Sequence, residues 1–176
     1  MRTFFFGVAV FLCLGTGARV AAQVPSGCGP VFAANDKLTT APHHIFTTQA
    51  LAGRTITSET VTVADVSYVL VQGRWSRSPT TPKARLQEER ENLRKAKSYS
   101  CQLVRNESVD GVATTIYRTH SESPDAAVSD VQVWIAKSTG LPLKREIDTG
   151  RDGKPATMHI AQRFEYVNVQ IPPGVK

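Results

Sequence analysis

The stretch VQVWIAKSTGLPLKREI, residues 131–147, has the pattern of a complete β-hairpin. Apolar and polar residues alternate on both sides of a short polar break, Lys137-Ser138-Thr139-Gly140, as in two antiparallel strands joined by a turn. Gly140 adopts the positive φ of such a turn more cheaply than any other residue there. Because one face is apolar and the other charged, the hairpin predicts a sheet with water on one side only.

Further strands are predicted before and after this hairpin. Their residues are rich in Val, Ile, Thr and Tyr at alternate positions, which favours half-buried strands. The predicted strands cover residues 44–51, 54–64, 67–72, 99–108, 112–120, 128–136, 141–149 and 156–170. Short turns, such as 109–111 and 150–153, join the last five, which predicts an antiparallel meander.

Two helices are predicted, each before a group of strands. The first covers residues 30–41, follows Cys28 and is stopped by Pro42. The second covers residues 83–97, with Thr81 as its cap and a proline at its start. Its apolar stripe is thin, so it is either a solvated surface helix or a movable lid over a cavity.

The first 22 residues have the pattern of an export signal. Arg2 gives a positive start, residues 4–14 are apolar, and Val20-Ala21-Ala22 offers small residues for cleavage. A membrane anchor is the alternative, but the apolar run is too short to span a bilayer as a helix. We therefore expect residues 1–22 to be a signal peptide, residues 23–176 to form a single domain, and the mature protein to reach the periplasm.

The charge balance is mildly basic. The chain has 21 Lys and Arg against 15 Asp and Glu. Loss of Arg2 and Arg19 with the signal leaves 19 against 15, a net charge of +4. Without a clustered basic face, this charge does not indicate a nucleic-acid partner.

Two cysteines remain after removal of the signal, which contains Cys13. They are Cys28 and Cys101, and in an exported protein a disulfide is the natural interpretation. Two alternatives stay open: a pair of buried thiols, or an acylated Cys28 with Cys101 free. Acylation fits poorly because Pro25 stands where a lipoprotein signal has leucine.

No catalytic motif is found in the sequence. It lacks the GxSxG elbow, the HExxH zinc motif and the phosphate-binding loop. Two of its histidines, His43 and His44, are adjacent on a predicted strand and point to opposite faces, so a shared metal is disfavoured. We expect no catalysis, no metal and no cofactor. A cleft in which His120 or His159 met an acid and a hydroxyl would instead indicate an enzyme.

Several segments resemble the LolA-like superfamily of periplasmic carriers, typified by outer-membrane lipoprotein-sorting proteins. They are Val133-Trp134-Ile135 and Thr139-Gly140-Leu141-Pro142 in the hairpin, Phe164-Glu165-Tyr166-Val167-Asn168-Val169, and YVLVQGRW at residues 68–75. The order of the predicted elements is also similar. The resemblance implies an α+β fold: an unclosed, curved antiparallel sheet of about eight strands, a half-barrel, with two helices on its concave side.

The same resemblance implies a cavity that accepts acyl chains. We therefore expect a non-catalytic periplasmic binding or carrier protein for a lipid, lipoprotein or other hydrophobic ligand. Its expected partners are that ligand or lipoprotein acyl chains and, further, envelope membrane proteins; we expect a monomer and no nucleic acid. The alternative is a cell-envelope structural or protein-interaction module whose sheet interior is fully packed.

Alternation within the strands selects candidates for the concave, ligand-binding face. They are Tyr68, Leu70, Ile116, Val133, Ile135, Leu143, Ile160 and Phe164. For the hairpin, the face of Val133 and Ile135 is preferred because it is more uniformly apolar than the face of Trp134. A slip of one residue in any strand would invert the choice for that strand.

Overall fold

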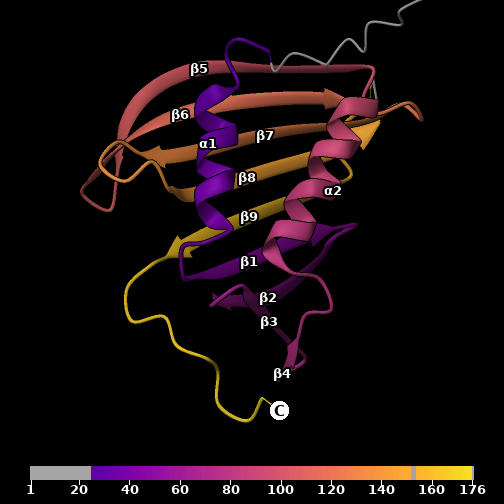
Figure 1. Cartoon of the computed structure of the whole chain (residues 1–176). Helices are drawn as coiled ribbons and strands as arrows, with labels where there is room; N and C mark the ends of the chain where they lie inside the picture. The colour runs from indigo at the N-terminus through magenta and orange to yellow at the C-terminus, as the bar shows by residue number, and fades with distance from the viewer. Residues whose placement is uncertain (1–24, 152–153, 176) are drawn as a thin grey trace, which may run out of the picture.

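The computed structural model of the chain describes residues 25–151 and 154–175, so the predicted signal peptide lies outside the described residues. Two helices and nine strands are found within these ranges (Figure 1). They are α1 (Gly29–Leu38), β1 (His43–Leu51), β2 (Arg54–Val63), β3 (Val66–Val71), β4 (Arg74–Arg77), α2 (Pro82–Lys95), β5 (Ser98–Val109), β6 (Val112–Glu122), β7 (Ala127–Ala136), β8 (Pro142–Arg151) and β9 (Met158–Glu165).

The strands form one antiparallel sheet in the order β4-β3-β2-β1-β9-β8-β7-β6-β5. It consists of two meanders joined where the first strand pairs with the last. The sheet is curved and unclosed, since β4 and β5 are its two edges, and both helices cross the same face (Figure 1). This confirms the expected α+β fold and the meander of the last five strands.

Two strand predictions need correction. The first is β4, Arg74–Arg77, which is not among the strands predicted from the sequence. This short strand pairs with β3 through four residues. With it the sheet has nine strands, where about eight were expected. The second is β9, which ends at Glu165 and not at residue 170.

The central hairpin forms as its sequence predicts. Gly140 has a φ of 69°, and its amide donates a hydrogen bond to the Ala136 carbonyl at 2.8 Å. A register shift falls between Trp134 and Ile135, and Ile135 pairs with Pro142. The proline therefore sits at an irregular point of the ladder, where its missing amide hydrogen is tolerated.

Strand register defines two faces of the sheet, because directly paired residues point to the same side. The face crossed by both helices is called the helix-covered face, and the other the outer face. Under α1, Val31 and Ala34 pack against Val133 and Ile135, and Tyr117 packs beside this cluster. The core therefore lies between α1 and the middle of β7.

The second helix begins as predicted. Thr81 accepts a hydrogen bond from the Ala84 amide at 3.2 Å, and Pro82 occupies the first turn. The helix ends at Lys95, two residues earlier than expected. None of its fourteen residues is buried, so α2 packs far more lightly than α1.

Candidate functional site

Four of the eight candidate residues lie on the helix-covered face. Val133 and Ile135 pack under α1. Ile160 pairs with Ile147, and Phe164 pairs with Ile45, on the same side of the sheet. Whether these side chains contact a ligand stays a prediction.

Three candidates lie on the outer face, contrary to the expected concave placement. Tyr68 pairs with Val61, which itself pairs with His44. Leu70 follows two positions later on the same side, and Ile116 pairs with the outer-face residue Trp134. The physical reason on β3 is that both of its faces are largely apolar, so hydrophobic alternation gives no direction there.

The remaining candidate, Leu143, stands at the irregularity of the central hairpin. It lies between Pro142, which pairs with Ile135, and Lys144, which pairs with Trp134. With Trp134 and Lys144 it lines a hollow on the outer face. An extra residue in one strand breaks the simple alternation on which its expected placement depended.

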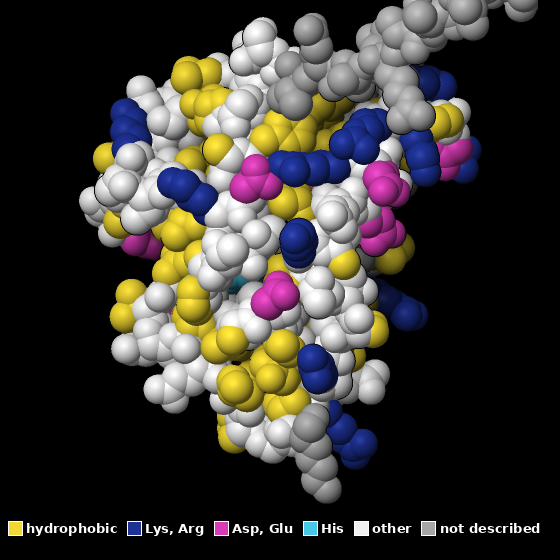
Figure 2. Space-filling model, viewed as in Figure 1, with side chains coloured by type: hydrophobic (Ala, Val, Ile, Leu, Met, Phe, Trp, Pro, Cys, Tyr) yellow, Lys and Arg dark blue, Asp and Glu magenta, His cyan; other side chains and the backbone are white. Residues whose placement is uncertain are grey.

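A cleft of about 220 Å³ lies on the helix-covered face, between the end of α1 and the start of α2. Its apolar lining includes Leu38, Ile45, Leu86, Ile147 and Phe164. Figure 2 shows apolar patches among charged side chains of both signs over this side of the molecule. Polar and charged side chains, such as Thr60, Thr62 and Gln162, line the rest of the cleft, so an apolar part and a polar part lie side by side within it. An amphiphilic small molecule needs both kinds of contact.

Arg145 is the charged group on the floor of this cleft. Its guanidinium donates a hydrogen bond to Asn35 Oδ1 at 2.8 Å and lies 5.7 Å from the ring centroid of Phe164. Asn35 in turn donates to Glu89 Oε1 at 3.5 Å, so one polar chain joins β8, α1 and α2. Burial lowers the pKa of Arg145, and the charge of Glu89 opposes that shift.

Arg145 was absent from the sequence-based candidates, although one signal for it was available. It stands two residues before Ile147, and so on the same side of β8. In the charged run Lys144-Arg145-Glu146, the simplest interpretation of each side chain is that it is solvated. This interpretation overlooks that Arg145 points toward the helices.

His43 also lines the cleft and is only 5% exposed. Its Nδ1 contacts the Ala41 carbonyl at 2.8 Å. Burial lowers the pKa of His43, with a smaller contribution from Arg85, while the hydrogen bond to Ala41 opposes the shift. The neutral ring is therefore the form that the fold prefers.

This preference predicts a pH effect on stability. Because the folded-state pKa of His43 lies below its unfolded value, its contribution is complete above about pH 6.5 and declines as the pH falls below it. Urea unfolding from pH 7.5 to 5.5 should show a smaller loss of stability for His43→Gln than for the unsubstituted protein. An equal or larger loss in the variant would contradict this assignment.

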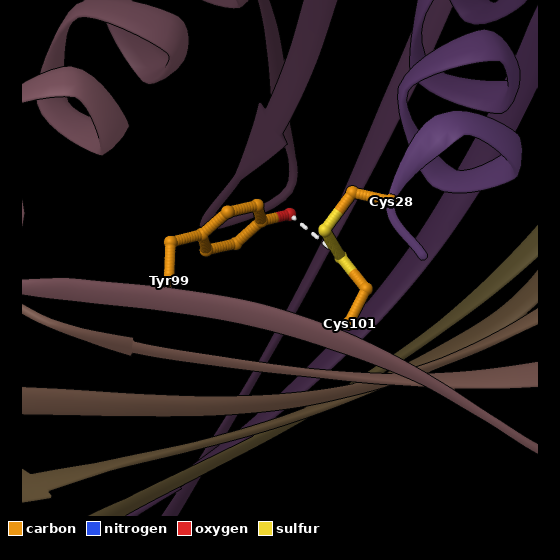
Figure 3. The surroundings of a disulfide bond; sticks show 3 residues. All are labelled: Cys28, Tyr99 and Cys101. Atoms are coloured by element: carbon orange, nitrogen blue, oxygen red, sulfur yellow. Dashed lines mark hydrogen bonds between the residues drawn. A yellow bond between two sulfur atoms is a disulfide. The ribbon is translucent and has the colours of Figure 1, made fainter. Parts of the chain in front are cut away.

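The first helix is fixed at both ends. At its start, a disulfide joins Cys28 to Cys101 on β5, with Cα atoms 5.0 Å apart, and the Tyr99 hydroxyl donates to Cys101 Sγ at 3.5 Å (Figure 3). At its end, Lys37 Nζ donates to the Thr139 carbonyl at 2.6 Å. The predicted disulfide is confirmed, and the two alternatives for these cysteines are not realised in the structure.

The start of this tether requires glycine. A Cβ atom at Gly27 would lie 2.6 Å from the carbonyl oxygen of Cys101, a backbone atom that cannot move aside cheaply. The segment before α1 can thus approach β5 closely only because residue 27 has no side chain.

The second helix, by contrast, lies over open space. The cleft lies under its first half, and a second hollow of about 330 Å³ lies beside its last turns. This second hollow is lined by Leu93 of α2, by Ala96 directly after the helix, and by residues at the ends of β6, β7 and β8, including Val128. An ion pair between Arg90 and Asp36 at 2.6 Å and the contact of Asn35 with Glu89 connect α2 to α1.

The outer face carries its own hollow, of about 520 Å³. Cations lie over aromatic rings there: Lys144 Nζ is 4.6 Å from the Trp134 ring and Arg163 is 4.4 Å from the Phe46 ring. The Trp134 indole donates to Glu107, which lowers the pKa of that carboxyl. These paired groups largely satisfy one another, and the helices do not cover them.

The histidines considered for catalysis lie outside the cleft. His120 pairs with Asp130 at 2.9 Å and His159 with Asp148 at 2.8 Å, on the exposed outer face. Among the described residues, no three His, Cys, Asp or Glu side chains come close enough to hold a metal ion. Neither His120 nor His159 therefore meets an acid and a hydroxyl in a cleft, the arrangement that would have indicated an enzyme.

Three solved structures illustrate what the chain is similar to, each at low identity. The lipoprotein LppX of Mycobacterium tuberculosis matches with a TM-score of 0.44 and 12% identity, over 81% of this chain and 100% of that one. MucB in the Pseudomonas aeruginosa MucA/MucB complex matches with 0.48 and 14%, over 82% of this chain and 58% of MucB. A LolA superfamily protein of Nitrosomonas europaea matches with 0.27 and 11%, over 86% and 96%.

No protein-family model and no curated protein sequence matches the chain. This chain spans about three fifths of the length of MucB. Within residues 25–151 and 154–175, no helix has both the length and the apolar character needed to cross a membrane.

Proposed function

We propose that this chain is a non-catalytic binding or carrier protein of the periplasm. Its ligand is hydrophobic, such as a lipid or the acyl chain of a lipoprotein, and enters between α2 and the sheet. The observation that carries the proposal is the packing of α2. A helix that lies over a sheet without burying any of its own residues gains little from its position. Such a helix can move at small cost, in contrast to the tethered α1.

The size of the cleft supports the same view. Its volume of about 220 Å³ is below the range of roughly 300–1,000 Å³ typical of ligand pockets. An outward shift of α2 would join it to the hollow of about 330 Å³ beside the end of the helix. On this proposal α2 is the lid, and the disulfide-tethered α1 is the fixed wall.

Uncovered apolar side chains continue the same face beyond the helices. Ile56 pairs with Gln49, which pairs with Ile160, and this places Ile56 on the helix-covered side. By the same alternation, Leu51 and Val71 point to this side, and all three are at least 42% exposed. A ligand chain longer than the cleft would find apolar contacts along this extension.

A matched pair of substitutions on β2 tests the proposal. Thr60 lines the cleft, whereas Thr57, three residues earlier, points to the outer face. Thr60→Trp fills the cleft, so we expect it to weaken binding of the uncharged fluorescent probe N-phenyl-1-naphthylamine about tenfold, which corresponds to about 1.4 kcal/mol. Thr57→Trp should bind the probe like the unsubstituted protein.

The opposite results would favour the alternative function. If the unsubstituted protein binds no probe, or if both tryptophan variants bind it equally well, the helix-covered face does not accept ligands. The outer face, with its hollow around Trp134 and Phe46, would then be the better candidate for a protein-interaction surface.

A further inference from the structure

We infer that the ligand has an acidic head, and that Arg145 binds it: the cleft recognises a single-chain amphiphile with a terminal carboxylate. This inference rests on the proposed function and narrows its ligand class. Three observations carry it: the position of the cation, the state of its donors, and the charges around it.

The position of Arg145 is unusual for a cation in a half-buried sheet. It points to the helix-covered face between Val133 on β7 and Gln162 on β9, its partners across the two neighbouring strands. Apolar side chains line the cleft next to it, among them Ile147 and Phe164. A charge among such neighbours is costly unless a partner compensates it.

Protein groups compensate Arg145 only in part. Of the described residues, Asn35 is the one that accepts a hydrogen bond from its side chain, and Asn35 is neutral. No carboxylate of these residues lies within ion-pair distance of it. A guanidinium has five N–H donors in a planar fork that matches a carboxylate.

The other guanidinium donors are reachable from the cleft. No buried side-chain nitrogen or oxygen of the described residues lacks a hydrogen-bond partner. The single hydrogen bond to Asn35 does not use all the guanidinium nitrogens, so the others are not sealed inside the protein. The space that Arg145 lines is the cleft. A carboxylate arriving there would form charge-assisted hydrogen bonds at short range.

The neighbouring charges favour a monoanion. Glu89 lies close enough to raise the pKa of Arg145, yet its carboxylate contacts Asn35 and not the guanidinium. The cleft is lined by two cations, Arg85 and Arg145, and one acid, Glu89, a balance of +1. This balance suits a carboxylate better than a phosphate dianion, which Glu89 would repel more strongly. The apolar lining beside Arg145 then receives the chain attached to that head.

The test compares dodecanoate with dodecanol as competitors for bound N-phenyl-1-naphthylamine. These two molecules share the chain and differ in head charge. We expect dodecanoate to compete at least tenfold better than dodecanol. Arg145→Met should remove this preference by weakening dodecanoate alone, and Arg145→Lys, which keeps the charge without the fork, should retain part of it. Acetate in excess should not displace the probe, since a carboxylate without a chain lacks the apolar contacts.

A second variant avoids the risk that Arg145→Met does not fold. Glu89 is exposed on α2, so Glu89→Gln removes the repelling charge without disturbing the core. We expect it to tighten dodecanoate about threefold and to leave dodecanol unchanged.

The outcomes separate the two proposals. Equal competition by dodecanoate and dodecanol, or equal effects of Glu89→Gln on both, would overturn the role of Arg145 while leaving a carrier for neutral ligands. Probe binding that is absent altogether would overturn the proposed function and this inference with it.

Discussion

Removal of the disulfide by Cys28→Ser with Cys101→Ser will lower the free energy of unfolding by about 4 kcal/mol. The two cysteines are 73 residues apart in sequence, so the bond closes a long loop and greatly restricts the unfolded chain. The bond also fixes the start of α1, whose Val31 and Ala34 form the core with β7. Guanidinium unfolding followed by circular dichroism measures the change.

The matched control for this prediction is reduction. A thiol reductant should destabilise the unsubstituted protein by a similar amount and leave the double serine variant unaffected. A difference below about 1 kcal/mol between the two proteins would mean that α1 is held by its packing alone, and the fixed wall of the proposed cleft would lose its main support.

The second large effect is expected at Ile116, whose side chain is fully buried on the outer face beside Trp134. Ile116→Ala removes buried apolar atoms and leaves a cavity, which typically costs about 2–5 kcal/mol. Ile56→Ala makes the same chemical change at a side chain that is 54% exposed, and it should cost less than about 1 kcal/mol. Guanidinium unfolding followed by circular dichroism would measure both changes in the free energy of unfolding.

Ligand binding provides a second test of the face on which Ile116 lies. Because Ile116 lies on the outer face, its folded variant should bind N-phenyl-1-naphthylamine normally. Loss of probe binding in folded Ile116→Ala protein, or a larger stability loss for Ile56→Ala, would contradict the assignment of the faces.

Much of the fold can be predicted from the sequence because its signals are local. The turn at Gly140 and the alternation on both sides of it are contained within 17 residues, and the structure forms that hairpin. The cap at Thr81 and the prolines at the starts of both helices are equally local. These features need no knowledge of distant parts of the chain.

The features that escaped prediction depend on distant partners. The pairing of β1 with β9 joins segments more than 100 residues apart, and no local pattern specifies it. The faces of β3 could not be assigned because Tyr68 and Leu70 alternate with apolar residues, and only pairing with β2 orients them. The alternation of β8 turns Arg145 inward, but its hydrogen-bond partner Asn35 comes from α1, 110 residues away in sequence, and no local pattern identifies it.

The packing of α2 shows a related difficulty. Its thin apolar stripe was compatible with a solvated surface helix and with a lid, and the sequence does not choose between them. The structure places Leu86 and Leu93 of this helix over two hollows. Its lack of buried residues can be understood only together with the open space beneath it.

The central claim is that the helix-covered face holds a hydrophobic ligand, and native mass spectrometry tests it most directly. The protein would be purified from the periplasm, and its mass compared before and after extraction with organic solvent. We predict a mass excess that disappears on extraction and returns on incubation with dodecanoate. A mass equal to that of the polypeptide alone in all three samples would contradict the claim.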